Sequence, residues 1–203
     1  MSRVTAITPT IPGREAMLAE AVASVNAQTV PVHSHLIRCQ RPFGRGIVHV
    51  CHQFNALLAA VETEWFATLG DDDLWLPRHV ETAEPHLDDA DVVTTWGVNA
   101  PGGIRTNVSG WYREQLAAQF EFANFIPAIA FIRTSAVREV GGWPTEWEGG
   151  HRDQGGHFAG SAAWAEDWEL WRRLAANGAR FRCVEVETWV CRPGNWPRLS
   201  TTL

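Results

Sequence analysis

Short apolar runs alternate with segments of helical hydrophobic spacing over the first half of the chain. The apolar runs have lengths typical of strands and lie at residues 4–7, 33–39, 65–69 and 91–96. Between them, apolar residues recur three and four positions apart, which predicts helices at residues 14–28, 50–61 and 77–87. Residues 8–13 contain two prolines and a glycine and are expected to form a loop. This alternation is typical of an α/β fold with a mixed but mostly parallel, Rossmann-type sheet flanked by helices.

The second half of the chain has a less regular pattern. It predicts strands at residues 126–133, 181–186 and 188–191, and helices at residues 134–140 and 165–177. Two segments, residues 97–112 and 143–163, are expected to be loops because they are rich in turn-forming residues and lack periodicity. The second loop carries His151 and His157, and loops of this length are usually functional or disordered.

Composition and charge narrow the class of protein. At 203 residues and 45% hydrophobic content, the chain is expected to form a single domain with a substantial core. No apolar stretch approaches the ~18–20 residues of a membrane span, and the N-terminus lacks the pattern of a signal peptide, so a cytoplasmic protein is expected. A net charge of −6 without a basic run argues against general nucleic-acid binding. The four cysteines form no CxxC pair, which favours buried thiols over a zinc site.

A cluster of three aspartates follows the third predicted strand. Residues 65–69 end at Gly70, and Asp71, Asp72 and Asp73 come directly afterwards. Adjacent carboxylates repel one another unless a positive charge lies between them. The carboxyl edge of a sheet is where α/β proteins bind ligands, and Mg²⁺ or Mn²⁺ prefers carboxylate and phosphate oxygens. A helix cap explains one aspartate, Asp73, but not three, so the cluster favours a divalent-cation site.

A second acidic pair, Glu166 and Asp167, lies at the start of the helix predicted at residues 165–177. Acidic residues in a first helical turn are favoured by the macrodipole alone. A carboxylate at a helix start also suits general-base catalysis. The pair taken by itself leaves both interpretations open.

Five segments together resemble the family-2 glycosyltransferases, which are inverting enzymes of the GT-A fold. They are residues 4–10 with Arg14, residues 18–29, Asn55 with residues 67–77, residues 132–143, and residues 166–174. The segments follow the family's order and cover nearly the whole chain. The resemblance implies one glycosyltransferase domain over residues 1–203, with a nucleotide-sugar-binding half at 1–96 and an acceptor-binding and catalytic half at 97–203.

The resemblance implies a hexosyltransferase-type enzyme that moves a sugar from a nucleotide-diphosphate sugar to an acceptor hydroxyl, with inversion. Mn²⁺ or Mg²⁺ would be held by Asp72, with Asp71 as the second ligand or a ribose contact, and would offset charge on the leaving diphosphate. Asp167 is the expected general base, and Glu166 is the second candidate. The residues expected to bind the nucleotide sugar are Thr8, Pro9, Thr10, Arg14, Gln40, Asn55, Asp71 and Asp72.

The donor base and the acceptor stay open at this point. Family members commonly carry an acidic residue after the second strand, whereas residues 36–41 contain none, so Gln40 is expected to meet the base edge. UDP, GDP and dTDP donors all fit this pattern. Trp143 and Trp164 are expected to form apolar platforms for the acceptor. A glycan, a lipid-linked carrier, a protein and a modified nucleobase are the acceptors considered.

Two other functions fit parts of the sequence. A nucleotidyltransferase shares the architecture and the metal carboxylates, but it normally has a basic, glycine-rich phosphate loop that residues 8–14 do not provide. A noncatalytic module that binds sugar nucleotides or carbohydrates is the third candidate. Replacing Asp167 with asparagine separates it from an enzyme, since only an enzyme would lose turnover while still binding the donor.

Overall fold

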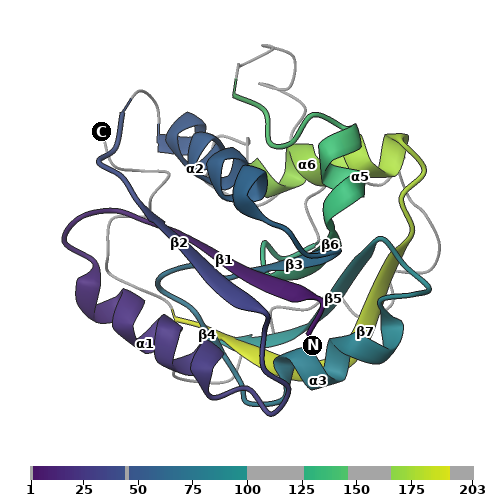
Figure 1. The fold of residues 1–203 in the computed structure, drawn as a ribbon, viewed down its shortest axis with the longest axis horizontal. Helices are drawn as coiled ribbons and strands as arrows, with labels where there is room; N and C mark the ends of the chain where they lie inside the picture. Colours follow the sequence, from purple (N-terminus) through teal and green to yellow (C-terminus); the bar gives the residue numbers. More distant parts are fainter. Residues whose placement is uncertain (1, 44–45, 100–125, 146–165, 193–203) are drawn as a thin grey trace.

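A single sheet with helices on both faces organises the chain (Figure 1). The computed structural model describes residues 2–43, 46–99, 126–145 and 166–192. The strands are β1 Val4–Thr10, β2 Ser34–Cys39, β3 Trp65–Thr68, β4 Leu74–Trp75, β5 Val92–Asn99, β6 Ala130–Arg133 and β7 Phe181–Cys191. The helices are α1 Glu15–Asn26, α2 Gly46–Ala60, α3 His79–Ala83, the 3₁₀ turn η1 Glu84–His86, α5 Thr134–Glu139 and α6 Glu166–Ala176.

The expected mixed sheet is confirmed, but parallel pairs do not predominate among the described strands. Its strand order is β2-β1-β3-β6-β5-β7-β4. β1 runs parallel to β2 and β3, and β5 runs parallel to β7. β6 is antiparallel to both β3 and β5, and β4 is antiparallel to β7. The α/β class is confirmed, whereas the strand directions are mixed.

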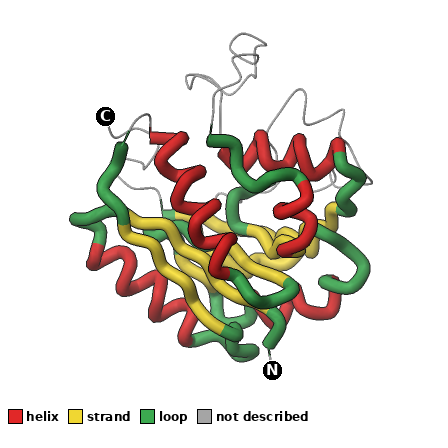
Figure 2. Tube along the Cα trace, turned by 45° about the horizontal axis from the view of Figure 1, so that its top comes forward, coloured by secondary structure: helices red, strands yellow, loops and turns green. Residues whose placement is uncertain are grey.

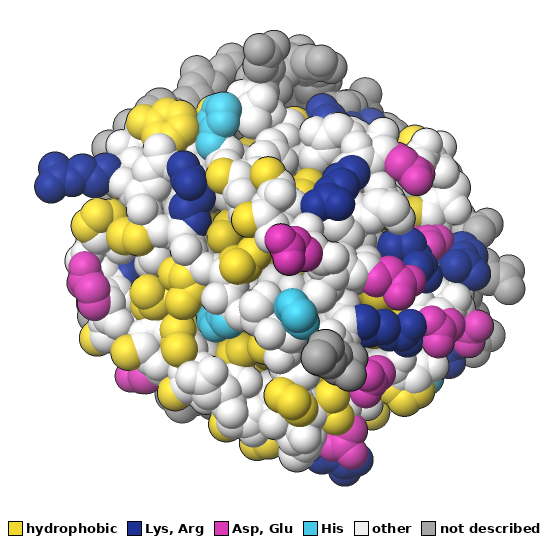
Figure 3. Space-filling view, viewed as in Figure 1, with side chains coloured by type: hydrophobic (Ala, Val, Ile, Leu, Met, Phe, Trp, Pro, Cys, Tyr) yellow, Lys and Arg dark blue, Asp and Glu magenta, His cyan; other side chains and the backbone are white. Residues whose placement is uncertain are grey.

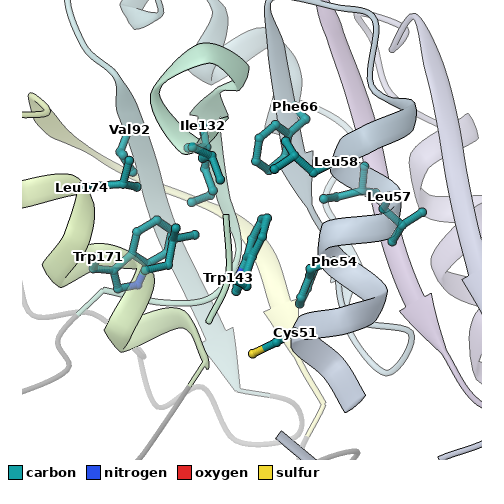
Figure 4. Packing of buried hydrophobic residues seen from close by; sticks show 14 of the residues in the cluster. Cys51, Phe54, Leu57, Leu58, Phe66, Val92, Ile132, Trp143, Trp171 and Leu174 are labelled. Carbon is teal, nitrogen blue, oxygen red and sulfur yellow. The ribbon is translucent and has the colours of Figure 1, made fainter. Parts of the chain in front are cut away.

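The helices divide between the two faces of the sheet (Figures 1 and 2). α2, α5 and α6 cover one face and α1 and α3 the other, so two separate hydrophobic clusters form. Successive strand residues point to opposite faces. In β3, Phe66 therefore joins the cluster under α2, and Trp65 joins the cluster under α1. Figure 4 shows the first cluster, in which Trp143 stacks on Phe54 with ring centroids 4.7 Å apart.

Several element boundaries differ from those expected. β1 continues to Thr10, so residues 8–10 belong to a buried strand and not to a loop. The strands expected at residues 181–186 and 188–191 are one strand, β7, whose pairing with β5 shifts register on both sides of Trp96. β4 was not expected, because two residues give no readable pattern. Only the start of the 143–163 loop is described, and His151, His157 and Trp164 lie outside the described residues.

Within the described ranges, no helix has both the length and the apolar character needed to cross a bilayer. On the face seen in Figure 3, acidic and basic side chains are interspersed. Asp91, for example, pairs with both Arg133 and Arg180.

The buried histidine His79 predicts a loss of stability in acid. Its Nδ1 lies 2.6 Å from Thr188 Oγ1, and aromatic rings of Trp75 and Phe131 pack against it. Burial lowers the pKa of His79 from 6.5 to about 3. The unfolded chain therefore takes up the proton first, so the contribution of His79 to stability is lost as the pH falls below about 6.5.

Relative to a His79→Gln variant, the wild type is expected to lose roughly 2 kcal/mol more unfolding free energy between pH 7 and pH 5. Urea unfolding at both pH values measures this difference, and other titrating groups cancel in the comparison. Parallel pH curves for wild type and His79→Gln would contradict the prediction.

Candidate active site

The polar residues singled out by the sequence gather at one edge of the sheet. β1 and β3 run side by side in the same direction, with Ile7 opposite Thr68. Thr10 is the last residue of β1, and Asp71 follows shortly after β3. The two residues are therefore neighbours although they lie 61 positions apart. β7 also ends here, because Arg192 directly after it contacts the Asp72–Asp73 segment. This edge is the one formed by the carboxyl ends of the parallel strands, where α/β folds bind ligands.

Asp71 is the buried centre of this edge. Its Oδ2 accepts a hydrogen bond from Thr10 Oγ1 at 2.5 Å, and its Oδ1 receives Arg14 Nη1 at 2.5 Å. Asp71 has no exposed surface and Arg14 has 5%. A carboxylate and a guanidinium removed from water stabilise each other only as a pair with good geometry. Asp71 and Arg14 therefore form a structural ion pair that joins α1 to the end of β3.

Asp72 and Asp73 lie differently from Asp71. Asp72 Oδ2 accepts Arg14 Nη2 at 3.0 Å, and its side chain is 33% exposed. Asp73 Oδ1 accepts the backbone N–H of Arg192 at 3.2 Å. The other oxygens, Asp72 Oδ1 and Asp73 Oδ2, would stand 2.9 and 3.2 Å from a Cβ placed on Gly70. One oxygen of each carboxylate therefore converges over the bare α-carbon of Gly70.

This arrangement changes which aspartates are suited to a cation. Both oxygens of Asp71 already accept a bond and are buried, so Asp72 and Asp73 are better placed for a cation, and a metal or ribose contact of Asp71 stays a prediction. Asp73 was expected to cap a helix, but β4 follows it and α3 begins only at His79. Burial, and next the charge of Asp72, raises the pKa of Asp73 to about 7, which a bound cation would reverse.

The donor set of Asp72 and Asp73 fits Mg²⁺ or Mn²⁺ in part. No group of three or more metal-binding side chains occurs among the described residues. Mg²⁺ is usually held by one or two carboxylates, with phosphate oxygens and water completing its shell. Two converging carboxylate oxygens are therefore sufficient if the substrate supplies phosphates.

The first strand supplies structure more than ligand contacts. Thr8 is buried, and its Oγ1 lies 2.9 Å from His35 Nε2 on the neighbouring strand. Pro9 is buried in the same strand. The expectation that both frame a nucleotide as loop residues is corrected, because β1 extends through them. His35 was missed by the sequence analysis; burial lowers its pKa to about 4, so it is neutral at pH 7.

Gln40 lies at the expected edge. Its backbone N–H donates to the carbonyl of Thr10 at 3.2 Å, which places it beside the end of β1. Its side-chain Oε1 accepts two hydrogen bonds from Arg38, at 3.1 and 3.3 Å. These bonds orient the amide so that its NH₂ group is the part left to donate. Gln40 therefore suits a ligand group that accepts hydrogen bonds.

Asn55 and Trp143 form a structural contact with each other. Asn55 Nδ2 donates to the Trp143 carbonyl at 2.7 Å, and Trp143 N–H donates back to Asn55 Oδ1 at 2.8 Å. Gly142, with φ +78°, permits this approach, since a Cβ there would lie 2.4 Å from Asn55 Oδ1. Trp143 is 3% exposed and belongs to the core. The structure therefore gives both residues a packing role, while the expected nucleotide contact of Asn55 and acceptor contact of Trp143 stay predictions.

Glu166 and Asp167 form the first turn of α6, as expected. Asp167 Oδ1 accepts the backbone N–H of Trp168 at 2.7 Å. Burial, and next the charge of Asp167, raises the pKa of Glu166 to about 7. The charge of Glu166 also raises the pKa of Cys51, which places the start of α6 close to α2. A carboxylate with a pKa near 7 suits proton transfer at neutral pH, and this favours Glu166 more than its sequence position did.

Comparison with known proteins identifies the fold. The chain is similar to S. aureus TarS 1–349 in complex with UDP-GlcNAc, with a TM-score of 0.70, 14% identity, and coverage of 100% of this chain and 62% of that chain. It is also similar to the mannosyltransferase PcManGT from Pyrobaculum calidifontis in complex with GDP-Man and Mn²⁺, with a TM-score of 0.60, 17% identity, and coverage of 97% and 58%. A197 from STIV matches with a TM-score of 0.52 and 12% identity over 91% of this chain and 82% of that one.

The likeness is one of structure and not of sequence. No protein-family model matches the chain, and no curated protein matches it. The chain spans about 60% of the length of the TarS 1–349 and mannosyltransferase chains. Two of these structures hold nucleotide sugars, and one of the two also holds Mn²⁺. The chain therefore has the fold of these nucleotide-sugar-bound proteins, consistent with a GT-A-like architecture.

Proposed function

We propose that the protein is a glycosyltransferase that moves a sugar from a nucleoside-diphosphate sugar to an acceptor hydroxyl. The observation that carries the proposal is the convergence of Asp72 Oδ1 and Asp73 Oδ2 over Gly70, at the ligand-binding edge of this fold. Its support is that proteins of the same fold hold UDP-GlcNAc and GDP-Man. Family-2 membership and inversion belong to the proposal as well.

In this proposal, Asp72 and Asp73 would hold Mn²⁺ or Mg²⁺, and a bound cation would supply positive charge against that of the leaving diphosphate. The positive charge of Arg14 offsets the negative charges of Asp71 and Asp72, and its bond to Asp72 keeps that side chain oriented. Gln40 donates to an acceptor atom of the nucleoside, a property that UDP, GDP and dTDP share. The donor base is therefore left to experiment.

The acidic turn of α6 supplies the proton acceptor. The acceptor hydroxyl loses its proton while it attacks the anomeric carbon, and a carboxylate on that side takes the proton. Asp167 is the proposed base from the family resemblance, and Glu166 is proposed as the second carboxylate of the turn. A single displacement of this kind inverts the anomeric centre.

Replacing Asp167 with asparagine tests whether the protein turns over its donor. We expect nucleotide release to fall by about 10²–10⁴-fold, the usual contribution of a general base. Nucleotide affinity, measured by calorimetry, should stay within a factor of two of wild type because Asp167 does not touch the donor in the proposal. Glu166→Gln, assayed in parallel, assigns the base by whichever variant loses more.

The outcomes of this experiment distinguish a glycosyltransferase from a noncatalytic binding module and from a nucleotidyltransferase. Loss of turnover with retained binding supports an enzyme. Unchanged turnover in both variants would remove α6 from the mechanism and would favour the noncatalytic binding module. A nucleotidyltransferase would release diphosphate instead of a nucleoside diphosphate, so the product itself separates that alternative.

A further inference from the structure

Arg192 contacts the aspartate segment at atoms that Arg14 does not bind. It follows β7 directly, and its backbone N–H donates to Asp73 Oδ1 at 3.2 Å. Its side-chain Nε donates to the backbone carbonyl of Asp72 at 2.7 Å. Its guanidinium also pairs with Glu20 of α1. One residue thus joins the end of β7, the aspartate segment and α1.

The two arginines occupy complementary atoms of the aspartate segment. Arg14 binds Asp71 Oδ1 and Asp72 Oδ2, whereas Arg192 binds Asp73 Oδ1 and the main chain of Asp72. The oxygens over Gly70 are the others, Asp72 Oδ1 and Asp73 Oδ2. Holding one oxygen of each carboxylate thus turns its second oxygen toward the same place.

The segment needs such support from outside. Within it, the turn is closed by the hydrogen bond from Asp73 N–H to the Gly70 carbonyl, which is 3.2 Å long. Three consecutive carboxylates repel one another and would spread without fixed positive partners. A guanidinium suits this task because its planar donors engage several acceptors at once.

We propose that Arg192 is a positioning residue that aims the Asp72 and Asp73 carboxylates at a divalent cation. This inference rests on the proposed function, since the cation is the one that would bind the donor diphosphate. Arg192 acts through the two aspartates and touches neither the cation nor the sugar. Its effect should therefore appear in the dependence on Mn²⁺ and not in the nucleotide contacts.

Arg180 provides a matched control at the other end of the same strand. It directly precedes β7, as Arg192 directly follows it, and it pairs with Asp91 just before β5. Arg180→Gln removes a guanidinium that binds the Asp91 carboxylate, and Arg192→Gln removes one that binds the Asp72 main-chain carbonyl and Glu20. Only the second change lies at the edge that carries the proposed site.

The experiment measures free Mn²⁺ by electron paramagnetic resonance in titrations with saturating nucleoside diphosphate. For Arg192→Gln we expect an apparent Mn²⁺ affinity at least about ten-fold weaker, in line with loss of a charge-assisted hydrogen bond. Nucleotide binding should recover at high Mn²⁺. Arg180→Gln should match wild type in Mn²⁺ affinity even where its melting temperature falls. Both variants keep the backbone N–H that binds Asp73; Arg192→Lys also keeps the positive charge, so it should lie between, and it replaces Arg192→Gln if that variant does not fold.

The outcomes are distinguishable from a failure of the proposed function. Equal Mn²⁺ affinity in wild type and both Arg192 variants would overturn the positioning role while leaving the transferase proposal intact. Equal weakening by Arg180→Gln would also overturn it, because the effect would then follow stability. A wild-type protein that binds no nucleotide, with or without Mn²⁺, would overturn the proposed function and the positioning role together.

Discussion

Replacing Asp72 with asparagine is expected to reduce Mn²⁺-dependent turnover by about 10²–10³-fold, because several kcal/mol of metal-borne charge stabilisation would be lost. The asparagine has the same shape and its side-chain oxygen can still accept from Arg14. It lacks the negative charge that holds a divalent cation. Asp72 is 33% exposed, so the free energy of unfolding should change by less than about 1 kcal/mol.

Nucleotide release at a series of Mn²⁺ concentrations, together with urea unfolding, checks both parts of this prediction. Asp88→Asn is the control, since Asp88 is an exposed carboxylate paired with Arg3 through a surface contact. Its turnover should equal that of wild type. If Asp72→Asn kept full turnover at every Mn²⁺ concentration, Asp72 would not be a metal ligand.

Replacing the adjacent Asp71 with asparagine is expected to destabilise the fold by about 3 kcal/mol, as happens when one partner of a buried ion pair is removed. Asp71 is completely buried, and its loss leaves the Arg14 guanidinium, only 6% exposed, without its closest partner. The amide also replaces an acceptor with a donor opposite either Thr10 or Arg14. The loss should be visible as a lower urea midpoint with an unchanged m-value.

Thr10→Val provides the graded comparison for Asp71→Asn. It removes the 2.5 Å hydrogen bond to Asp71 but leaves the ion pair in place. We expect it to cost about 1–2 kcal/mol, and less than Asp71→Asn. A stability equal to wild type in Asp71→Asn would show that this carboxylate is not the structural partner of Arg14.

Asp71 and Asp72 illustrate how much of the candidate site could be predicted from the sequence. A short apolar strand, a glycine and an acidic cluster were enough to predict a candidate site after β3, but not that Arg14 would pair with the cluster. Which of three identical residues turns inward was not predictable from their order. That choice depends on the parallel pairing of β1 with β3, which puts Thr10 and Arg14 against Asp71.

Residues outside the motif escaped the sequence analysis for a similar reason. Arg192 is a single arginine after the last strand, and its contacts arise only because β7 lies beside β4. Asn55 was assigned to the nucleotide from its resemblance, but its amide holds the Trp143 peptide. Long-range pairs of this kind leave no periodicity in the chain.

The positions of most strands could be predicted from the sequence, but their directions could not. Apolar runs marked where most strands lie, because buried strands need apolar residues on both faces. They did not reveal that β6 runs antiparallel to β3 and β5, since a buried run reads alike in either direction. β4, with two residues, was too short to be recognised.

The central claim is that the edge beside β3 binds a nucleoside diphosphate together with a divalent cation. A thermal-shift panel of UDP, GDP, dTDP, CDP and ADP, each with and without Mn²⁺, tests it most directly. A ligand that binds only the native state raises the melting temperature by mass action. The predicted result is stabilisation by one of these nucleotides that requires Mn²⁺ and disappears in Asp72→Asn. No shift with any nucleotide, or an equal shift in Asp72→Asn, would contradict the claim.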